Sequence, residues 1–328
     1  MRVFIAGATG VLGRRLVAAC TGRGHDVVGL TRDDEGDEAV RERGGEPTRG
    51  DVLYRDSVVD AAADSDVLVH AATQIPTDTN PEESDWAAND RVRRTGAENV
   101  VAAADAVDAD RVVLQSVVWV ARQPDGSAFD EDATPHPDRT TQSALDAERI
   151  VREAADESGF EPVVLRGGYF YAHDSAHART FGERLLARRL PIVARGPLGR
   201  RDATLSFVHV EDAASAFAAA VDGDATGTYH VVDDEPTTYA AFIRELANRL
   251  DAPRPFRVPA WLARLPFDAD VLRLLTAPMP TSNARFEAAF DWTPEYPTIA
   301  DGLDQVVSRW RENGRLRETA EGYEWTDD

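Results

Sequence analysis

The sequence predicts an α/β fold, in which a doubly wound parallel sheet is joined to a small, discontinuous and mostly helical C-terminal lobe. Short runs rich in Val, Ile and Leu alternate with helical patterns, which is typical of parallel strands covered by helices on both faces. The first such run leads directly into a glycine-rich loop and then a helical pattern. Right-handed strand–helix–strand crossovers from this start give a doubly wound sheet.

The alternation is clearest in the first half of the chain. β-branched runs predict strands, and amphipathic patterns between them predict helices. A further short strand is expected just before Gly50. The expected strands are 2–6, 26–30, 66–70, 111–116, 162–166, 206–210 and 228–232, and the main expected helices are 10–22, 35–44, 86–106, 143–158 and 211–221.

After Arg166 the alternation breaks, and from residue 238 the pattern is mostly helical and interrupted by proline. This change predicts two domains. The first is 1–166 plus 204–232, and the second, smaller lobe is 167–203 plus 233–328. The polar residues 316–328 are expected to fray.

Composition excludes several chemistries. The 328 residues include 58 acidic and 36 basic side chains, for a formal charge of −22, and every basic residue is an arginine. Without lysine the chain has no Schiff-base lysine and no P-loop lysine. The negative charge argues against nucleic acid and anionic membranes as partners. A single cysteine, Cys20, excludes an internal disulfide.

No targeting segment or membrane-length apolar run is found, so a cytoplasmic location is expected. Scattered aspartate and glutamate without lysine is typical of a halophilic protein, whose carboxylates keep the surface hydrated in a high-salt cytoplasm. The alternative is an acidic protein from an ordinary cytoplasm.

The segment 7–13, Gly-Ala-Thr-Gly-Val-Leu-Gly, follows an expected strand and opens an expected helix. Glycine permits a tight turn and lets the backbone approach a pyrophosphate at the helix N-terminus, where the helix dipole favours negative charge. The pattern therefore predicts a Rossmann-type dinucleotide site. Its expected binding residues are Gly7, Thr9, Gly10, Val11, Leu12 and Gly13.

The end of the second strand predicts which dinucleotide binds. An acid there would bind a ribose diol, whereas an arginine would bind a 2′-phosphate. This strand ends at Arg32, and Arg14 follows the glycine loop as a second cation, so NADP is favoured and NAD is the alternative. Arg32 could instead be a solvated arginine paired with Asp33 or Asp34.

Two later strand ends are also expected to contact the cofactor. Asp51, within Gly50-Asp51-Val52, is placed to accept a hydrogen bond from the adenine amino group. The small residues Ala71 and Ala72 allow close approach to the adenosine and the pyrophosphate.

These motifs together resemble the NAD(P)-dependent epimerase/dehydratase family of extended short-chain dehydrogenase/reductases, over nearly the whole chain. The resemblance also rests on His70-Ala71-Ala72, Asn89, Ser116, residues 207–212 and Trp292-Thr293-Pro294. It implies a Rossmann fold, cofactor contacts from Val52 and Asn89, and Ser116 in the place of the family's catalytic serine.

The chain departs from this family in its catalytic residues. The family uses a tyrosine and a lysine spaced Tyr-x-x-x-Lys, and matching Glu148 to the family's glutamate on the following helix places Thr140 and Ala144 at those positions. Tyr169 or Tyr171, in the segment that borders nicotinamide and substrate in the family, is therefore expected to supply a proton. In the alternative, both rings only line the pocket or the core.

Other charged side chains of the lobe leave alternatives open. His173 and His177 have the spacing of a metal pair on a helix, but no third ligand supports them and no metal is expected. The pairs at residues 188–189 and 200–201 are arginines that face either an anionic substrate or surface acids.

The leading functional prediction is an oxidoreductase that moves hydride between NADP(H) and a small carbonyl, alcohol or sugar-type substrate, with Ser116 polarising the carbonyl. A catalytically silent NADP(H)-binding sensor or assembly protein is the first alternative, which the missing tyrosine and lysine favour. A nucleotide-sugar epimerase or dehydratase is the second. The expected partner is a small-molecule substrate, and the chain could also form a homodimer.

Overall fold

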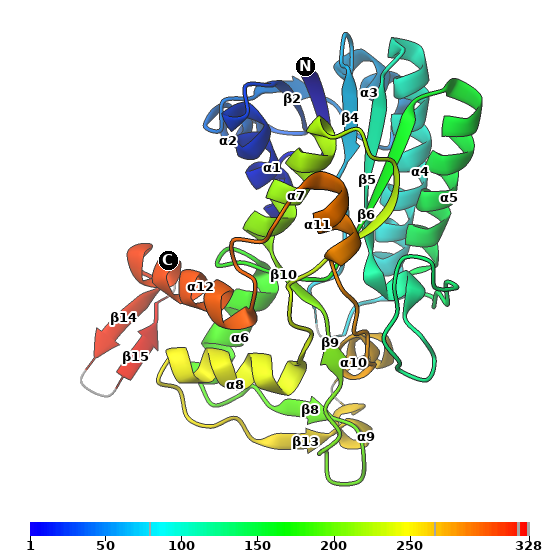
Figure 1. Cartoon of the computed structure of the whole chain (residues 1–328). Coiled ribbons are helices and arrows are strands. Elements are labelled where there is room, and N and C mark those ends of the chain that lie inside the picture. Colours follow the sequence, from blue (N-terminus) through cyan, green and yellow to red (C-terminus); the bar gives the residue numbers. More distant parts are fainter. Residues whose placement is uncertain (79, 266, 320–321, 327–328) are drawn as a thin grey trace.

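The computed structural model describes residues 1–78, 80–265, 267–319 and 322–326, and confirms the predicted doubly wound sheet (Figure 1). Seven strands lie in the order β3-β2-β1-β4-β5-β6-β11, and each pairs with its neighbours in parallel. The strands are β1 (Arg2–Ala6), β2 (Asp26–Thr31), β3 (Glu46–Arg49), β4 (Val67–His70), β5 (Arg111–Val117), β6 (Glu161–Gly167) and β11 (Gly227–Val231).

Helices cover both faces of this sheet, because successive strand side chains point to opposite sides. Val3 and Ile5 of β1 pack in one core cluster, whereas Phe4 and Ala6 pack in another. The first cluster lies under α1 (Val11–Gly22), α2 (Asp34–Arg41), α7 (Val210–Asp222) and α11 (Ala284–Phe290); the second lies under α3 (Arg55–Ala61), α4 (Glu83–Val107) and α5 (Gln142–Ser158).

A second lobe lies at one end of the sheet, drawn at the bottom of Figure 1. Its core includes Phe207, Phe242 and Trp310, all buried. Its elements are η1 (Val118–Ala121), β7 (Tyr169–Tyr171), α6 (Ala176–Leu186), β8 (Ile192–Ala194), β9 (Thr204–Leu205), β10 (Phe207–His209), β12 (Thr237–Thr238), α8 (Tyr239–Arg249), β13 (Arg257–Pro259), α9 (Ala260–Ala263), α10 (Ala269–Thr276), α12 (Ile299–Glu312), β14 (Leu316–Thr319) and β15 (Gly322–Trp325).

Two expectations about the second half of the chain need correction. The strand expected at 206–210 is only β10, and it pairs with β7 outside the main sheet. The residues from Leu316, expected to fray, form the antiparallel hairpin β14–β15. The hairpin is held by packing, because the Trp325 ring lies 5.1 Å from the buried Trp310 ring. Residues 327–328 lie outside the described part.

The topology creates a crevice at a predictable place. Connections leave β1 toward one face of the sheet and β4 toward the other, and ligands of open α/β sheets bind at such a switch point, at the carboxyl ends of the strands. The second lobe covers this edge (Figure 1). Among the residues that the structure describes, no helix combines the length and apolarity needed to cross a membrane.

Candidate active site

A cavity of about 740 Å³ runs along the carboxyl ends of the strands and under the second lobe. Eleven of the thirteen residues predicted to bind the cofactor line it. They are Gly7, Thr9, Gly10, Val11, Leu12, Gly13, Arg32, Asp51, Val52, Ala71 and Ala72. The remaining two, Arg14 and Asn89, do not line it.

The glycine loop has the geometry that a pyrophosphate site requires. Gly7 has a φ of +94°, and a Cβ there would lie 2.6 Å from the backbone nitrogen of Ala72. A Cβ on Gly13 would lie 1.9 Å from the carbonyl oxygen of Gly7. Only glycine fits these two positions, so α1 begins close against the loop and its free N–H groups face the cavity. The residues present therefore fit a dinucleotide.

Arg32 lies exposed at the adenosine end of the cavity. The acids considered as its partners have other contacts: Asp33 accepts a hydrogen bond from the Gly36 N–H at 2.8 Å, and Asp34 pairs with Arg49. No ion pair is found for Arg32 within the described part of the chain. Its guanidinium is therefore free to bind an anion.

Arg14, expected to be the second cation of this site, does not line the cavity. Its guanidinium donates to the Thr9 carbonyl oxygen at 2.9 Å and to the Asp174 carboxylate at 2.7 Å. Arg14 thus links the glycine loop to the segment before α6 and does not reach the cavity.

Asn89 also supports the site from outside. Its side-chain oxygen accepts a hydrogen bond from the Gln74 N–H at 2.9 Å, and the residue is fully buried. Gln74 itself lines the cavity. Asn89 therefore fixes the segment after β4 and does not itself line the cavity.

Ser116 does not face the cavity. Its hydroxyl donates to the Glu148 carboxylate at 2.6 Å, and Arg166 donates to both oxygens of that carboxylate, at 2.8 and 2.7 Å. Burial alone would raise the pKa of Glu148, but the Arg166 guanidinium and the Ser116 hydroxyl hold it below its ordinary value. The neighbours Gln115 and Val117 face the cavity instead.

Of the two candidate tyrosines, the structure places only Tyr169 at the cavity. Its ring lies edge-on to Trp119 and His177, and burial raises its pKa. Tyr171 is buried in the core, where its hydroxyl donates to Asp233 at 3.1 Å. Of the two candidates, Tyr169 is therefore the one whose phenol lies at the cavity and is protonated at neutral pH.

Thr140 lines the cavity, as expected for the place of the family's tyrosine, whereas Ala144 packs in the core of the second lobe. The arginine pairs at 188–189 and 200–201 lie outside the lining. Several polar and aromatic residues that line this region were not predicted: Trp86, Arg93, Trp119, Arg184 and Tyr239. His177, considered only for a metal pair, also lines it.

Arg93 was within reach of a sequence argument. Asn89 had been selected on the predicted helix, and residues four apart lie on the same helix face. Arg93 is therefore one turn beyond Asn89 on the face turned to the cavity. Trp119 and Arg184 carried no comparable signal, because η1 and α6 reach the site only through tertiary packing.

The part of the cavity that the second lobe lines has an apolar end. Its side chains come from α6, β8, α10 and the loops beside them. They are Phe181, Leu190, Val193, Phe267, Val271, Leu274 and Leu275.

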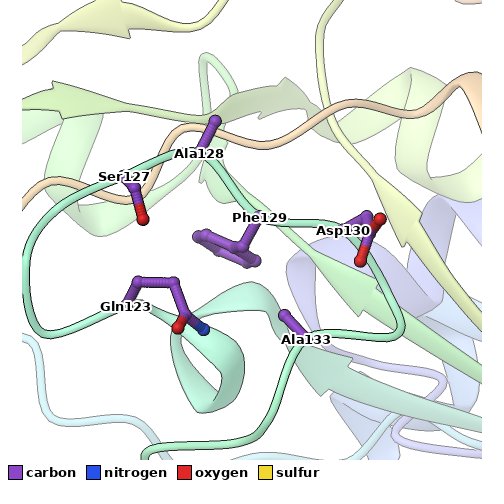
Figure 2. A pocket seen from close by; sticks show the side chains of 6 residues that line it. All are labelled: Gln123, Ser127, Ala128, Phe129, Asp130 and Ala133. Atoms are coloured by element: carbon purple, nitrogen blue, oxygen red, sulfur yellow. The ribbon is translucent and has the colours of Figure 1, made fainter.

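A second, open depression lies against the loop after η1 (Figure 2). Its polar groups already have partners, since Gln123 donates to the Ala121 carbonyl at 2.7 Å and Ser127 donates to Asp125 at 2.7 Å. The Phe129 ring fills its centre (Figure 2). This depression therefore offers no comparable binding groups. No group of three or more His, Cys, Asp or Glu suited to a metal occurs in the described part of the chain.

A glycine loop at the switch point of a parallel sheet is the arrangement of a nicotinamide-dependent oxidoreductase. A family model described as "NAD dependent epimerase/dehydratase family" matches residues 3–232. The chain belongs to this family, as the resemblance predicted.

Relatives are similar over most of the chain. A 3-diazoavenalumate denitrifying reductase from a Streptomyces species is 36% identical, covering 92% of this chain and 99% of that protein. The ceramide reductase of Caulobacter vibrioides is 28% identical, covering 92% and 88%. Among solved structures, the UDP-glucose 4-epimerase of Thermus thermophilus in complex with NAD has a TM-score of 0.75 at 23% identity, covering 94% and 99%. This last likeness shows the fold alone.

Proposed function

We propose that the protein is an NADPH-dependent reductase that transfers hydride to a carbonyl or similar electrophile of an apolar substrate. One observation carries the proposal: the part of the glycine-loop cavity that the second lobe lines is formed largely by aliphatic and aromatic side chains. Such a lining suits an apolar group better than a sugar. The reductases similar to this chain support the same reading.

Each part of the site has a proposed task. The loop from Gly7 to Gly13 would hold the pyrophosphate, Arg32 the 2′-phosphate and Asp51 the adenine. When bound, the reduced nicotinamide supplies the hydride. Tyr169 keeps its proton at neutral pH and donates a hydrogen bond or the proton to the substrate oxygen. The apolar end excludes water from the reacting atoms.

We assign these tasks to the two domains expected from the sequence: residues 1–166 plus 204–232 bind the cofactor, and residues 167–203 plus 233–328 bind the substrate. The fold departs from these bounds at four elements, since η1, β9 and β10 lie with the second lobe and α11 packs on the sheet. We also propose a high-salt cytoplasm as the setting, on the charge of −22 and the absence of lysine.

The test is oxidation of NADPH, followed by its absorbance, with cinnamaldehyde as an apolar aryl aldehyde and UDP-glucose as a nucleotide sugar. We expect turnover with the aldehyde and none with the sugar. Gly7→Ala should abolish NADPH binding, because its Cβ would meet the Ala72 backbone, whereas Gly22→Ala, which opens into free space, should not.

A catalytically silent NADP(H) sensor remains the second candidate. It is favoured by one observation: Ser116 is turned away, and Thr140 and Ala144 replace the family's tyrosine and lysine. Tight NADPH binding without turnover of any carbonyl in a broad panel would establish the sensor and reject the reductase.

A further inference from the structure

Four arginines of the described part are buried, and one of them differs from the others. Arg166 pairs with Glu148 at 2.7 Å, Arg122 pairs with Asp138 at 2.8 Å, and Arg111 pairs with Glu161. Arg93 is 6% exposed and has no carboxylate within ion-pair distance among the described residues. It is the member of this group that lines the cavity.

The fold compensates this charge only in part, because Asp90 on the same helix favours the cation without forming an ion pair with it. The side-chain hydrogen bond found for Arg93 joins its Nη1 to the carbonyl oxygen of Thr140 at 3.1 Å. Burial lowers the pKa of Arg93 to about 10, so it is still a cation at neutral pH. An isolated buried cation is costly unless an anion accompanies it. Something outside the chain is therefore expected to supply the negative charge.

The rest of the lining points the same way. Arg184 of α6 also lines the cavity and has no ion pair in the described part of the chain. The protein carries 58 acidic residues, yet among the described residues the carboxylates in the lining are Asp51 and Asp78 alone. The cofactor phosphates are assigned to the glycine loop and Arg32. Arg93 is instead hydrogen-bonded to Thr140, which also lines the cavity.

We propose that the substrate carries a carboxylate and that Arg93 binds it. A guanidinium offers two parallel N–H groups that match the two oxygens of a carboxylate. The substrate class is then an amphipathic carboxylate: an apolar body for the apolar end of the cavity, and an anionic group for Arg93. This inference rests on the proposed reductase function, because it names the substrate of the same site.

The binding test uses trans-cinnamate and its uncharged counterpart cinnamamide as probes, titrated by calorimetry into the full-length protein saturated with NADP⁺. The parent should bind cinnamate about tenfold to a hundredfold more tightly than cinnamamide. Arg93→Met should remove this preference and leave cinnamamide affinity within about twofold. Arg91→Met, an exposed arginine on the same helix, should change neither.

A second measurement needs no ligand. Because the unliganded parent holds a buried cation with no ion pair, Arg93→Met should raise its melting temperature. Arg166→Met should lower it, since that change removes the buried partner of Glu148 and leaves this carboxylate with Ser116 and the partly exposed Arg152. A fall with Arg93→Met would show a structural cation and overturn the proposal.

Other outcomes also decide the question. Equal affinity of the parent for both probes, or no cinnamate binding at millimolar concentration, would overturn the proposal. So would weaker NADP⁺ binding by Arg93→Met, which would assign this residue to the cofactor. Failure of the reductase proposal has a different result, which is NADPH binding without turnover of cinnamaldehyde. The affinities for cinnamate and cinnamamide can still be measured in that case.

Discussion

Ser116 donates its hydroxyl hydrogen to Glu148 across 2.6 Å, so the side chain expected to polarise a substrate carbonyl is instead part of a buried ion-pair network. Side chains alternate along a strand, and the side of β5 that faces the cavity is occupied by Gln115 and Val117. The position that the resemblance assigned to a catalytic hydroxyl therefore serves the core. Any hydrogen-bond donor for the substrate has to come from another element.

Ser116→Ala should reduce stability and leave turnover intact. The substitution removes one of the donors to a buried carboxylate, which costs about 1.5–3 kcal/mol of unfolding free energy. Chemical denaturation and NADPH oxidation by the folded protein would be measured together. Tyr169→Phe is the comparison, since it should lower turnover with little loss of stability. A loss of turnover in Ser116→Ala without loss of stability would restore Ser116 to the chemistry.

Arg32→Ala should weaken NADPH binding about tenfold to a hundredfold and leave NADH binding nearly unchanged. The reason is that a guanidinium–phosphate contact is charge-assisted and is absent from NADH. Fluorescence titration with both nucleotides measures the difference, and Arg91→Ala is the matched control. Equal losses for the two nucleotides would give Arg32 a structural role.

Acid should unfold the protein through its buried histidines. Burial lowers the pKa of His70 to about 4, against an ordinary value of 6.5. Between pH 6.5 and pH 4, His70 binds a proton in the unfolded chain but not in the folded one. Its contribution to the unfolding free energy is therefore fully present above pH 6.5 and is lost as the pH falls toward 4.

The test is His70→Gln, with unfolding free energies measured by denaturant at pH 7 and pH 5 in molar KCl. The variant should lose about 2 kcal/mol less than the parent over this interval, which corresponds to one proton over about 1.5 pH units. Exposed His136→Gln is the control and should behave as the parent. If the parent and His70→Gln lost the same unfolding free energy between pH 7 and pH 5, His70 would have the same pKa in the folded and unfolded chain.

The melting temperature should rise steeply between dilute buffer and molar KCl. A charge of −22 repels itself most at low ionic strength, where the Debye length is about 30 Å at 0.01 M, compared with about 3 Å at 1 M. Sucrose at matched osmolality is the control, because it is excluded from the protein surface but does not screen the repulsion between carboxylates. A melting temperature that does not respond to KCl would contradict adaptation to high salt.

The sheet and the glycine loop were predictable because they depend on local patterns. Runs such as 3–6 and 112–114 are apolar at every position, as parallel strands covered on both faces require. Gly7 and Gly13 are dictated by close backbone approach, which no other residue permits. The C-terminal hairpin was missed because polar residues carry no sign that Trp325 will reach Trp310.

The site residues were less predictable, because their direction is set by neighbours distant in sequence. Whether Ser116 faces the cavity or Glu148 depends on the register of β5, and a shift of one residue reverses it. Arg14 is withdrawn by Asp174, a residue 160 positions away. The motifs locate the end of β5 for Ser116 and the glycine loop for Arg14. They do not show which side chains at these two places turn toward the cavity.

The eight-residue helix α10 alone contributes Val271, Leu274 and Leu275 to the apolar end of the cavity. It is held by a small separate cluster with Val193, Ala263 and Leu272, apart from the cores that support the sheet. Replacement of this one helix can therefore change substrate preference, while the glycine loop and the strand ends that bind the cofactor stay the same. The fold therefore allows new substrates to be accepted during evolution by changes in one short segment. The same exchange can be made in the laboratory.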